Sequence, residues 1–326
     1  MVKYITGLAL LLVSAPISFS WQTLTLAPRG SSARGRTGLA ACVCRARGES
    51  AQTPFLPKIN HPAAFADDAA FAAWPACNDG ETQTLLGVGA RTRIGEPMLT
   101  HLDDSGAKTP MAALARELAK TGAVDSKEFF EAAEFYHRVR RRVRRATVVD
   151  LACGHGLTGI MFAALERTVS RVVLVDSRRP ASFDLILAAA VRVAPWTADK
   201  VQFCEADLFA EAGASKSVLP FDIAAPGDQH GCVAVHACGL ATDRCLEIAT
   251  LLGGPMALMP CCYSGATKEV PFALRRALGK SLAADIDRTY RLHAAGYHVD
   301  WATIPRAITP MNRIIIATPR GVAVGS

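Results

Sequence analysis

The sequence predicts a doubly wound α/β fold with a mostly parallel seven-stranded sheet and an antiparallel last strand. Residues 148–159 have the pattern of a buried strand, a glycine turn and a helix start. Five short apolar runs each lead to a polar residue, and these residues are 26, 31, 29 and 25 positions apart. They are Asp150, Asp176, Asp207, His236 and Cys261. Each step suits one strand–helix–strand unit. Two closing strand-like runs joined through prolines complete the pattern.

The seven expected strands are short and rich in Val, Ile or Leu, as in a sheet covered on both faces. They lie at residues 147–151, 171–175, 201–204, 232–236, 255–259, 297–304 and 312–318. Helical patterns occupy residues 109–120, 159–167, 181–193, 242–252 and about 270–293. Thr242 or Asp243 is the expected N-cap of the helix that ends at Leu252.

The glycine turn after the first strand predicts a nucleotide-cofactor site. Gly154 and Gly156 allow a sharp turn and a close backbone approach, and the following helix start favours an anionic group. With Gly159 they satisfy the G-x-G-x-x-G pattern of a Rossmann-like site, and Asp176 stands where an acid holds ribose hydroxyls. This pattern alone leaves an NAD-dependent oxidoreductase open as an alternative.

The arrangement resembles the S-adenosylmethionine-dependent methyltransferases, through Asp150 at the first strand end and through the antiparallel ending. Residues 236–243, His-Ala-Cys-Gly-Leu-Ala-Thr-Asp, and the later Cys261-Cys262 are similar to a narrower group over residues 131–319. That group includes the tRNA acceptor-stem 2′-O-methyltransferases, the methyltransferase-like 25 proteins and the glutathione S-transferase C-terminal-domain-containing protein. Tyr263-Ser264 stands where the tRNA enzymes carry histidines.

The resemblance implies S-adenosylmethionine as cofactor and a role for each strand-end residue. Gly154 and Gly156 would receive the methionine moiety, with Asp150 near its ammonium group. Asp176 would accept hydrogen bonds from the ribose, and Asp207 would lie by the adenine. These five residues are the predicted cofactor-binding set.

Catalytic and substrate residues follow less directly from the pattern. His236 is placed to orient the acceptor or to take its proton, or alternatively to hold the backbone around the Gly239 turn. Cys261, Tyr263 and Arg313 are candidate substrate contacts. No metal is expected, because a C-x-x-C pair is absent and adjacent cysteines point apart if the strand pleat continues.

An arginine run precedes the first strand. Its members are Arg138, Arg140, Arg141, Arg142, Arg144 and Arg145. One interpretation is a surface for RNA phosphates, with Arg140, Arg141 and Arg144 as substrate contacts. The other is a solvated helix face that pairs with Glu128, Glu131 and Glu134. A tRNA-like RNA is therefore the leading acceptor, and a noncatalytic RNA-binding protein with a vestigial cofactor pocket is an alternative.

Composition and the N-terminus set the organisation of the chain. The 326 residues, half of them hydrophobic, suffice for one large core. Residues 1–20 have the pattern of a signal peptide, and residues 21–48 that of a transit segment, rich in arginine and free of acids. Together they resemble the bipartite presequence of algae with complex plastids. Plastid stroma is the expected location and the secretory pathway the alternative.

The remaining chain is nearly neutral. Residues 1–48 hold six basic groups and no acid, which leaves 30 basic against 29 acidic groups. Residues 49–125 are expected to form an N-terminal extension or cap, and residues 126–320 the methyltransferase domain. A monomer without stable membrane association after processing is the default expectation.

Overall fold

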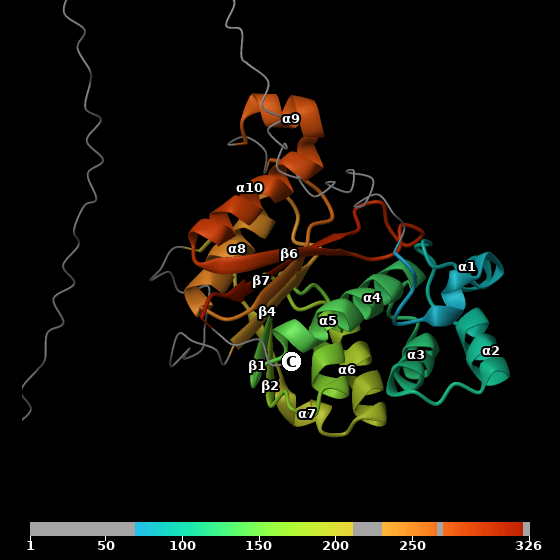
Figure 1. Cartoon of the computed structure of the whole chain (residues 1–326). Helices are drawn as coiled ribbons and strands as arrows, with labels where there is room; N and C mark the ends of the chain where they lie inside the picture. Colours follow the sequence, from blue (N-terminus) through green and yellow to red (C-terminus); the bar gives the residue numbers. More distant parts are fainter. Residues whose placement is uncertain (1–68, 211–229, 266–269, 322–326) are drawn as a thin grey trace, which may run out of the picture. The chain divides into compact units, whose positions relative to one another are not determined.

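The computed structural model describes residues 69–210, 230–265 and 270–321 (Figure 1). The predicted signal peptide (1–20), the transit-like segment (21–48) and the first part of the 49–125 extension lie outside the described residues. The plastid location therefore stays a prediction. In the described part of the chain, no helix is both long enough and apolar enough to cross a membrane.

The described chain contains a seven-stranded sheet in the order β3-β2-β1-β4-β5-β7-β6. The strands are β1 (Thr147–Leu151), β2 (Arg171–Asp176), β3 (Val201–Glu205), β4 (His230–Val235), β5 (Met256–Met259), β6 (Tyr297–Thr303) and β7 (Arg313–Pro319). Strands β1 to β5 pair in parallel, and β7 runs antiparallel to both β5 and β6. The predicted fold class is confirmed.

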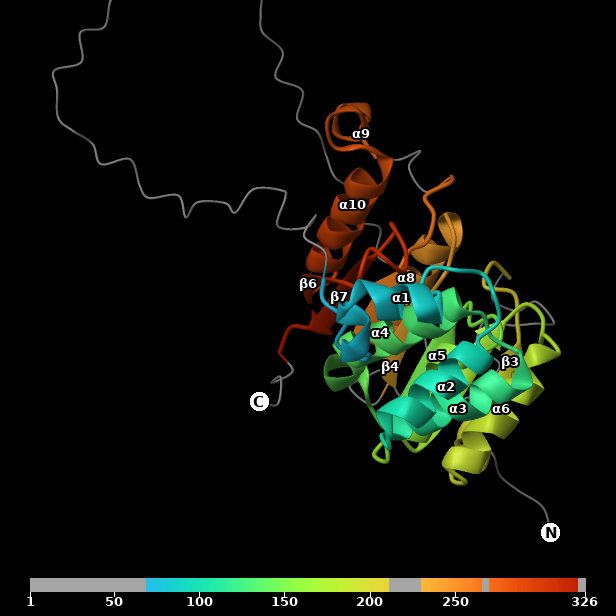
Figure 2. The same cartoon turned by 90° about the vertical axis from the view of Figure 1, so that its right-hand side faces the viewer.

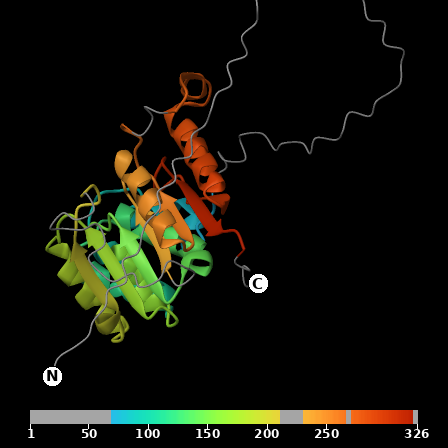
Figure 3. The same cartoon turned by 90° about the vertical axis from the view of Figure 1, so that its left-hand side faces the viewer.

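Helices cover both faces of the sheet. One layer contains α4 (Ser126–Val143), α5 (Leu157–Leu165), α6 (Ser182–Val193) and α7 (Thr197–Lys200), and Figure 2 shows this side. The opposite face, turned to the viewer in Figure 3, carries α8 (Leu240–Leu252) and α10 (Lys280–Ala294). The two hydrophobic cores take alternate residues of one strand, since Val148 packs into the first core and Val149 into the second.

The N-terminal helices extend the layer that contains α4 to α6. They are η2 (Pro75–Asn78), α1 (Gly80–Leu86), α2 (Glu96–Ser105) and α3 (Pro110–Thr121). Helix α3 packs on α6, and its N-cap Thr109 accepts a hydrogen bond from the Ala112 N–H, so the helix predicted at 109–120 is confirmed. Trp74 lies edge-on against Phe129 and Phe130. This part of the chain thus shares a core with the sheet.

Three helix boundaries differ from the prediction. The helix predicted over 270–293 is two helices, α9 (Phe272–Leu278) and α10, because Gly279 has a φ of 78° that interrupts the helical path. Helix α5 begins two residues earlier than predicted, at Leu157. The predicted N-cap at Thr242 or Asp243 is wrong: α8 begins at Leu240 and Asp243 lies in its first turn.

Asp243 instead belongs to a buried ionic network. Arg288, only 1% exposed, places one guanidinium nitrogen 2.9 Å from Asp243 Oδ2 and another 3.3 Å from Asp285 Oδ1. Asp285 also accepts hydrogen bonds from Tyr263 Oη at 2.7 Å and Arg313 Nε at 2.9 Å. The network ties α8 and α10 to the start of β7 and to the segment after β5.

We predict that Arg288→Ala lowers the free energy of unfolding by about 3 kcal/mol, because it removes the buried cation that Asp285 and Asp243 share. Arg291→Ala is the matched control. Arg291 also pairs with Asp243, at 2.9 Å, but its side chain is 44% exposed. Its loss should cost less than about 1 kcal/mol. Urea unfolding of both variants measures the difference, and equal losses would contradict a central role for Arg288.

Candidate active site

Two hollows lie at the carboxyl ends of the parallel strands. The first, about 180 Å³, is lined by the β1–α5 turn, the end of β4 and the first turns of α4. The second, about 250 Å³, is lined by the segments that follow β2 and β3. Ala152 lines both hollows. They lie at the point in the sheet where β2 and β4 flank β1 and the strand order reverses, which is where ligands bind in such folds.

The glycines of the turn have different tasks. A Cβ on Gly156 would lie 2.6 Å from Leu174 Cδ1, and one on Gly159 would lie 2.3 Å from Leu174 Cδ2. These two glycines therefore let α5 pack closely on β2. Gly154 has a φ of 56°, yet a Cβ there would meet nothing within 4 Å. Gly154 lines the first hollow, so the space beside it is open to a ligand.

Backbone strain marks the same place. Ala152 and His236 have φ values of 53° and 66°, a conformation that residues with a Cβ rarely adopt. Ala152 follows β1 and His236 follows β4, and both line the first hollow. Strained residues of this kind persist where the surrounding structure fixes them, and they cluster at functional sites.

Asp150 lines the inner wall of the first hollow, at the end of β1. It is 2% exposed, and its Oδ2 accepts a hydrogen bond from the Gly159 N–H at 2.9 Å. Burial raises the pKa of Asp150 to about 7, against the opposing effect of the Gly159 N–H. The carboxyl group therefore fixes the start of α5.

The predicted ribose and adenine residues lie together at the second hollow. Asp176 accepts a hydrogen bond from the Gly154 N–H at 2.8 Å, and Asp207 accepts one from the Phe209 N–H at 2.9 Å. Phe209, which the sequence interpretation missed, also lines this hollow and is 57% exposed. An aromatic residue two positions after a strand-end acid is the signal that indicates it.

Two acids on α4 also face the site and were missed as site residues. Glu128 Oε2 lies 3.3 Å from His155 Nε2, and Glu131 Oε2 lies 2.9 Å from His236 Nε2. The hydrogen bond with His155 lowers the pKa of Glu128 to about 2. Burial opposes the charged form of His236, but its contacts with Cys261 and Glu131 prevail and raise its pKa to about 9.

The arginine run lies toward the other end of α4. Arg140 and Arg144 contact Glu166 at 2.7 and 2.9 Å, and Arg138 pairs with Glu134. The predicted pairing with Glu128 and Glu131 is therefore wrong, because these acids face the histidines. Helix α4 ends at Val143, so the run continues past the helix, and Arg141 is exposed. None of these arginines lines either hollow.

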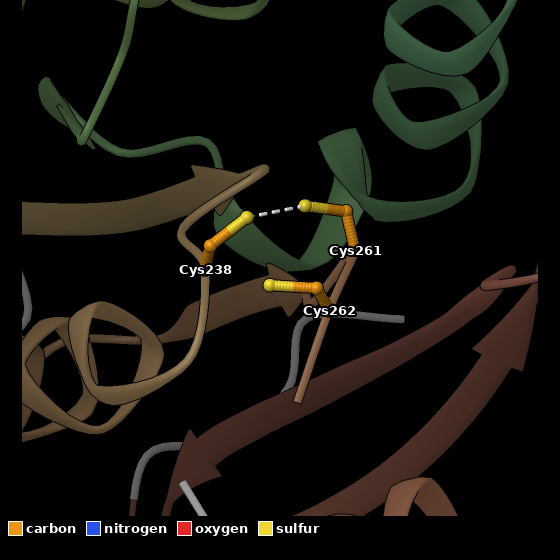
Figure 4. A group of neighbouring side chains, drawn as sticks. All are labelled: Cys238, Cys261 and Cys262. Atoms are coloured by element: carbon orange, nitrogen blue, oxygen red, sulfur yellow. Dashed lines mark hydrogen bonds between the residues drawn. The ribbon is translucent and has the colours of Figure 1, made fainter. Parts of the chain in front are cut away.

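Three cysteines come together beside His236. The sulfur atoms of Cys238, Cys261 and Cys262 all lie within 4.8 Å of one another (Figure 4). The sequence argument that Cys261 and Cys262 point apart does not hold, because β5 ends at Met259 and the pleat stops there. Tyr263 and Arg313, predicted as substrate contacts, instead bind Asp285 in the buried network.

The buried carboxyl group gives a test by pH. The pKa of Asp150 is about 7 in the folded protein, against an ordinary value of 3.8. As pH rises, Asp150 therefore loses its proton at lower pH in the unfolded chain than in the folded one. Its contribution to stability is complete below about pH 4 and declines up to about pH 7, by about 4 kcal/mol in all. Asp150→Asn should lack this decline in unfolding titrations from pH 4 to 8. Parallel pH curves for the two proteins would contradict the burial argument.

Comparison with known proteins is consistent with this geometry. Residues 126–269 match a family model described as a methyltransferase domain. A glutathione S-transferase C-terminal domain-containing protein of Xenopus laevis is 24% identical over 208 residues, which cover 53% of this chain and 31% of that protein. This chain thus spans about a third of that relative's length.

Similar solved structures include the Methanococcus jannaschii fibrillarin pre-rRNA processing protein, with 13% identity and a TM-score of 0.37 over 56% of this chain and 69% of that chain. The aminoglycoside resistance methyltransferase NpmB1 has 15% identity and a TM-score of 0.36, over 56% of this chain and 91% of its own. The strand order and the family match decide against the oxidoreductase alternative. Over residues 126–269, the chain is therefore similar to methyltransferase domains.

Proposed function

We propose that this domain holds S-adenosylmethionine across the two hollows and transfers its methyl group to an RNA acceptor at the His236 side. The observation that carries the proposal is the placement of the hollows on either side of the glycine turn, with Ala152 lining both. The cofactor, when bound, supplies a methyl group on a positively charged sulfur, which is already activated for transfer. The protein's work is then binding, alignment and exclusion of water.

The second hollow suits the adenosine end. Asp176 uses Oδ2 for the Gly154 N–H. An ionised carboxylate offers further acceptor positions for ribose hydroxyls. Asp207 lies on the next strand end, and the exposed ring of Phe209 provides an apolar surface for the adenine.

The first hollow suits the methionine end. Glu128 lines it and stays ionised at neutral pH, because its pKa is about 2. We assign the cofactor's ammonium group to Glu128 rather than to Asp150, which is buried and bound to Gly159. The N-terminus of α5 opens on the same hollow, where its dipole favours the cofactor's carboxylate.

The acceptor side is the wall formed by His236 and its partner Glu131. The contact between them, at 2.9 Å, fixes the ring at the end of β4. We assign this pair to positioning the acceptor. An RNA acceptor is supported by the arginine run, where the single carboxylate of Glu166 faces both Arg140 and Arg144. Excess positive charge on a surface attracts phosphates.

Asp176→Ala should weaken binding of S-adenosylmethionine and S-adenosylhomocysteine at least about tenfold, because the ribose loses its acceptor and Gly154 loses its anchor. Isothermal calorimetry on the full chain measures this affinity. Asp184→Ala is the control, since Asp184 is an exposed acid on α6 that pairs with Arg179. Unchanged affinity in Asp176→Ala would overturn the assigned cofactor site.

The acceptor class is tested by transfer of a labelled methyl group to separate RNA and protein fractions, with label expected in RNA. Arg141→Glu should weaken RNA binding roughly fivefold at low salt and less at high salt, with S-adenosylhomocysteine affinity unchanged. The matched control is Arg276→Glu, an exposed arginine on α9. Label confined to protein, or equal RNA binding by both variants, would contradict an RNA acceptor bound through the arginine run.

A further inference from the structure

We propose that Cys238, Cys261 and Cys262 bind one divalent metal ion through three thiolates. Zn²⁺ is the ion that such thiolate ligands favour. Their sulfurs lie within 4.8 Å of one another. A Zn–S bond is about 2.3 Å, so two sulfurs on one ion stand about 3.8 Å apart in a tetrahedron and at most about 4.6 Å apart. Cys238 Sγ and Cys261 Sγ, 2.8 Å apart, would separate by about 1 Å on binding an ion, and no pair of the three sulfurs is more than 4.8 Å apart. The cluster therefore offers ligands for a single ion, whereas an iron–sulfur cluster generally uses four cysteines.

Packing of two loops brings these cysteines together. Gly239 has a φ of 58°, and a Cβ there would lie 2.1 Å from the carbonyl oxygen of Ser264. The turn after β4 therefore lies directly on the segment after β5, and the Gly239 N–H donates a hydrogen bond to the Cys262 carbonyl at 3.3 Å. Arg288 donates to the Gly239 carbonyl at 3.4 Å from the buried network. Backbone packing and the Arg288 contact thus hold the two loops together, independently of the cysteine side chains.

The surroundings of the sulfurs suit entry and binding of an ion. Cys238 is exposed, and Cys261 and Cys262 are half-buried, so solvent reaches the cluster. Cys238 Sγ and Cys261 Sγ face each other at 2.8 Å (Figure 4). In the described part of the chain, no other set of three Cys, His, Asp or Glu side chains comes together in this way.

Three protein ligands leave one tetrahedral position for water, as in zinc sites that exchange their fourth ligand. His236 is not part of this set, because neither of its ring nitrogens lies within 4.8 Å of all three sulfurs. Cys261 Sγ lies 3.7 Å from the carbonyl oxygen of His236, and His236 lines the first hollow. The ion would thus stand next to the acceptor side of the active site.

The test uses the full chain, purified under reducing conditions, loaded with Zn²⁺ or Co²⁺ and dialysed. Mass spectrometry of the metal content should give about one ion per chain, and Co²⁺ should show thiolate charge-transfer and tetrahedral absorption bands. Cys238→Ser and Cys262→Ser should each weaken binding at least about tenfold. Cys204→Ser, at a buried cysteine on β3, is the matched control and should bind as the unaltered chain does.

Three results would overturn the site. They are absence of retained metal, equal Co²⁺ bands in a variant with all three cysteines replaced by serine, and a Cys238–Cys261 disulfide in protein kept with reductant. Calorimetry with S-adenosylhomocysteine on the same samples separates this inference from the proposed function. Metal binding without cofactor binding would overturn only the proposed function. Cofactor binding without metal binding would overturn only the metal site.

Discussion

The position of β1 in the middle of the sheet is the constraint on which the rest of the site depends. It pairs in parallel with β2 on one side and with β4 on the other. The segments that follow β1 and β4 therefore lead away from each other and leave room for a ligand between them. The hydrogen bond from the Gly159 N–H to buried Asp150 then fixes where α5 starts. Both hollows and both strained residues, Ala152 and His236, follow from this arrangement.

The segment from His236 to Asp243 is mainly architectural. Thr242 donates a hydrogen bond to the carbonyl of Ala237, and Asp243 binds Arg288 and Arg291. These contacts hold the turn in which Gly239 touches the segment after β5. Within this segment, His236 lines the first hollow and Cys238 belongs to the cysteine cluster. A distinctive sequence block can thus serve the chemistry indirectly, by holding two side chains in place.

Helix α4 connects the two charged parts of the molecule. Its first turns carry Glu128 and Glu131 to the hollow, and its last turns carry the arginines to Glu166. Acids near the N-terminus and cations near the C-terminus also agree with the helix dipole, which stabilises both. The same helix packs against the N-terminal segment through Phe129 and Phe130. Its position therefore depends on that segment as well as on the sheet.

The sequence by itself determined the fold class, a mostly parallel sheet with an antiparallel last strand. It also determined the glycine turn and the strand-end residues Asp176 and Asp207. These features depend on local periodicity, on turn chemistry and on the rule that parallel strands share one carboxyl edge. Only the tertiary structure decided the partners of Glu128 and Glu131, the hydrogen bonds of Tyr263 and Arg313 to Asp285, and the meeting of three cysteines from two loops. Each of these depends on contacts between residues far apart in the chain, whose side-chain directions no local pattern specifies.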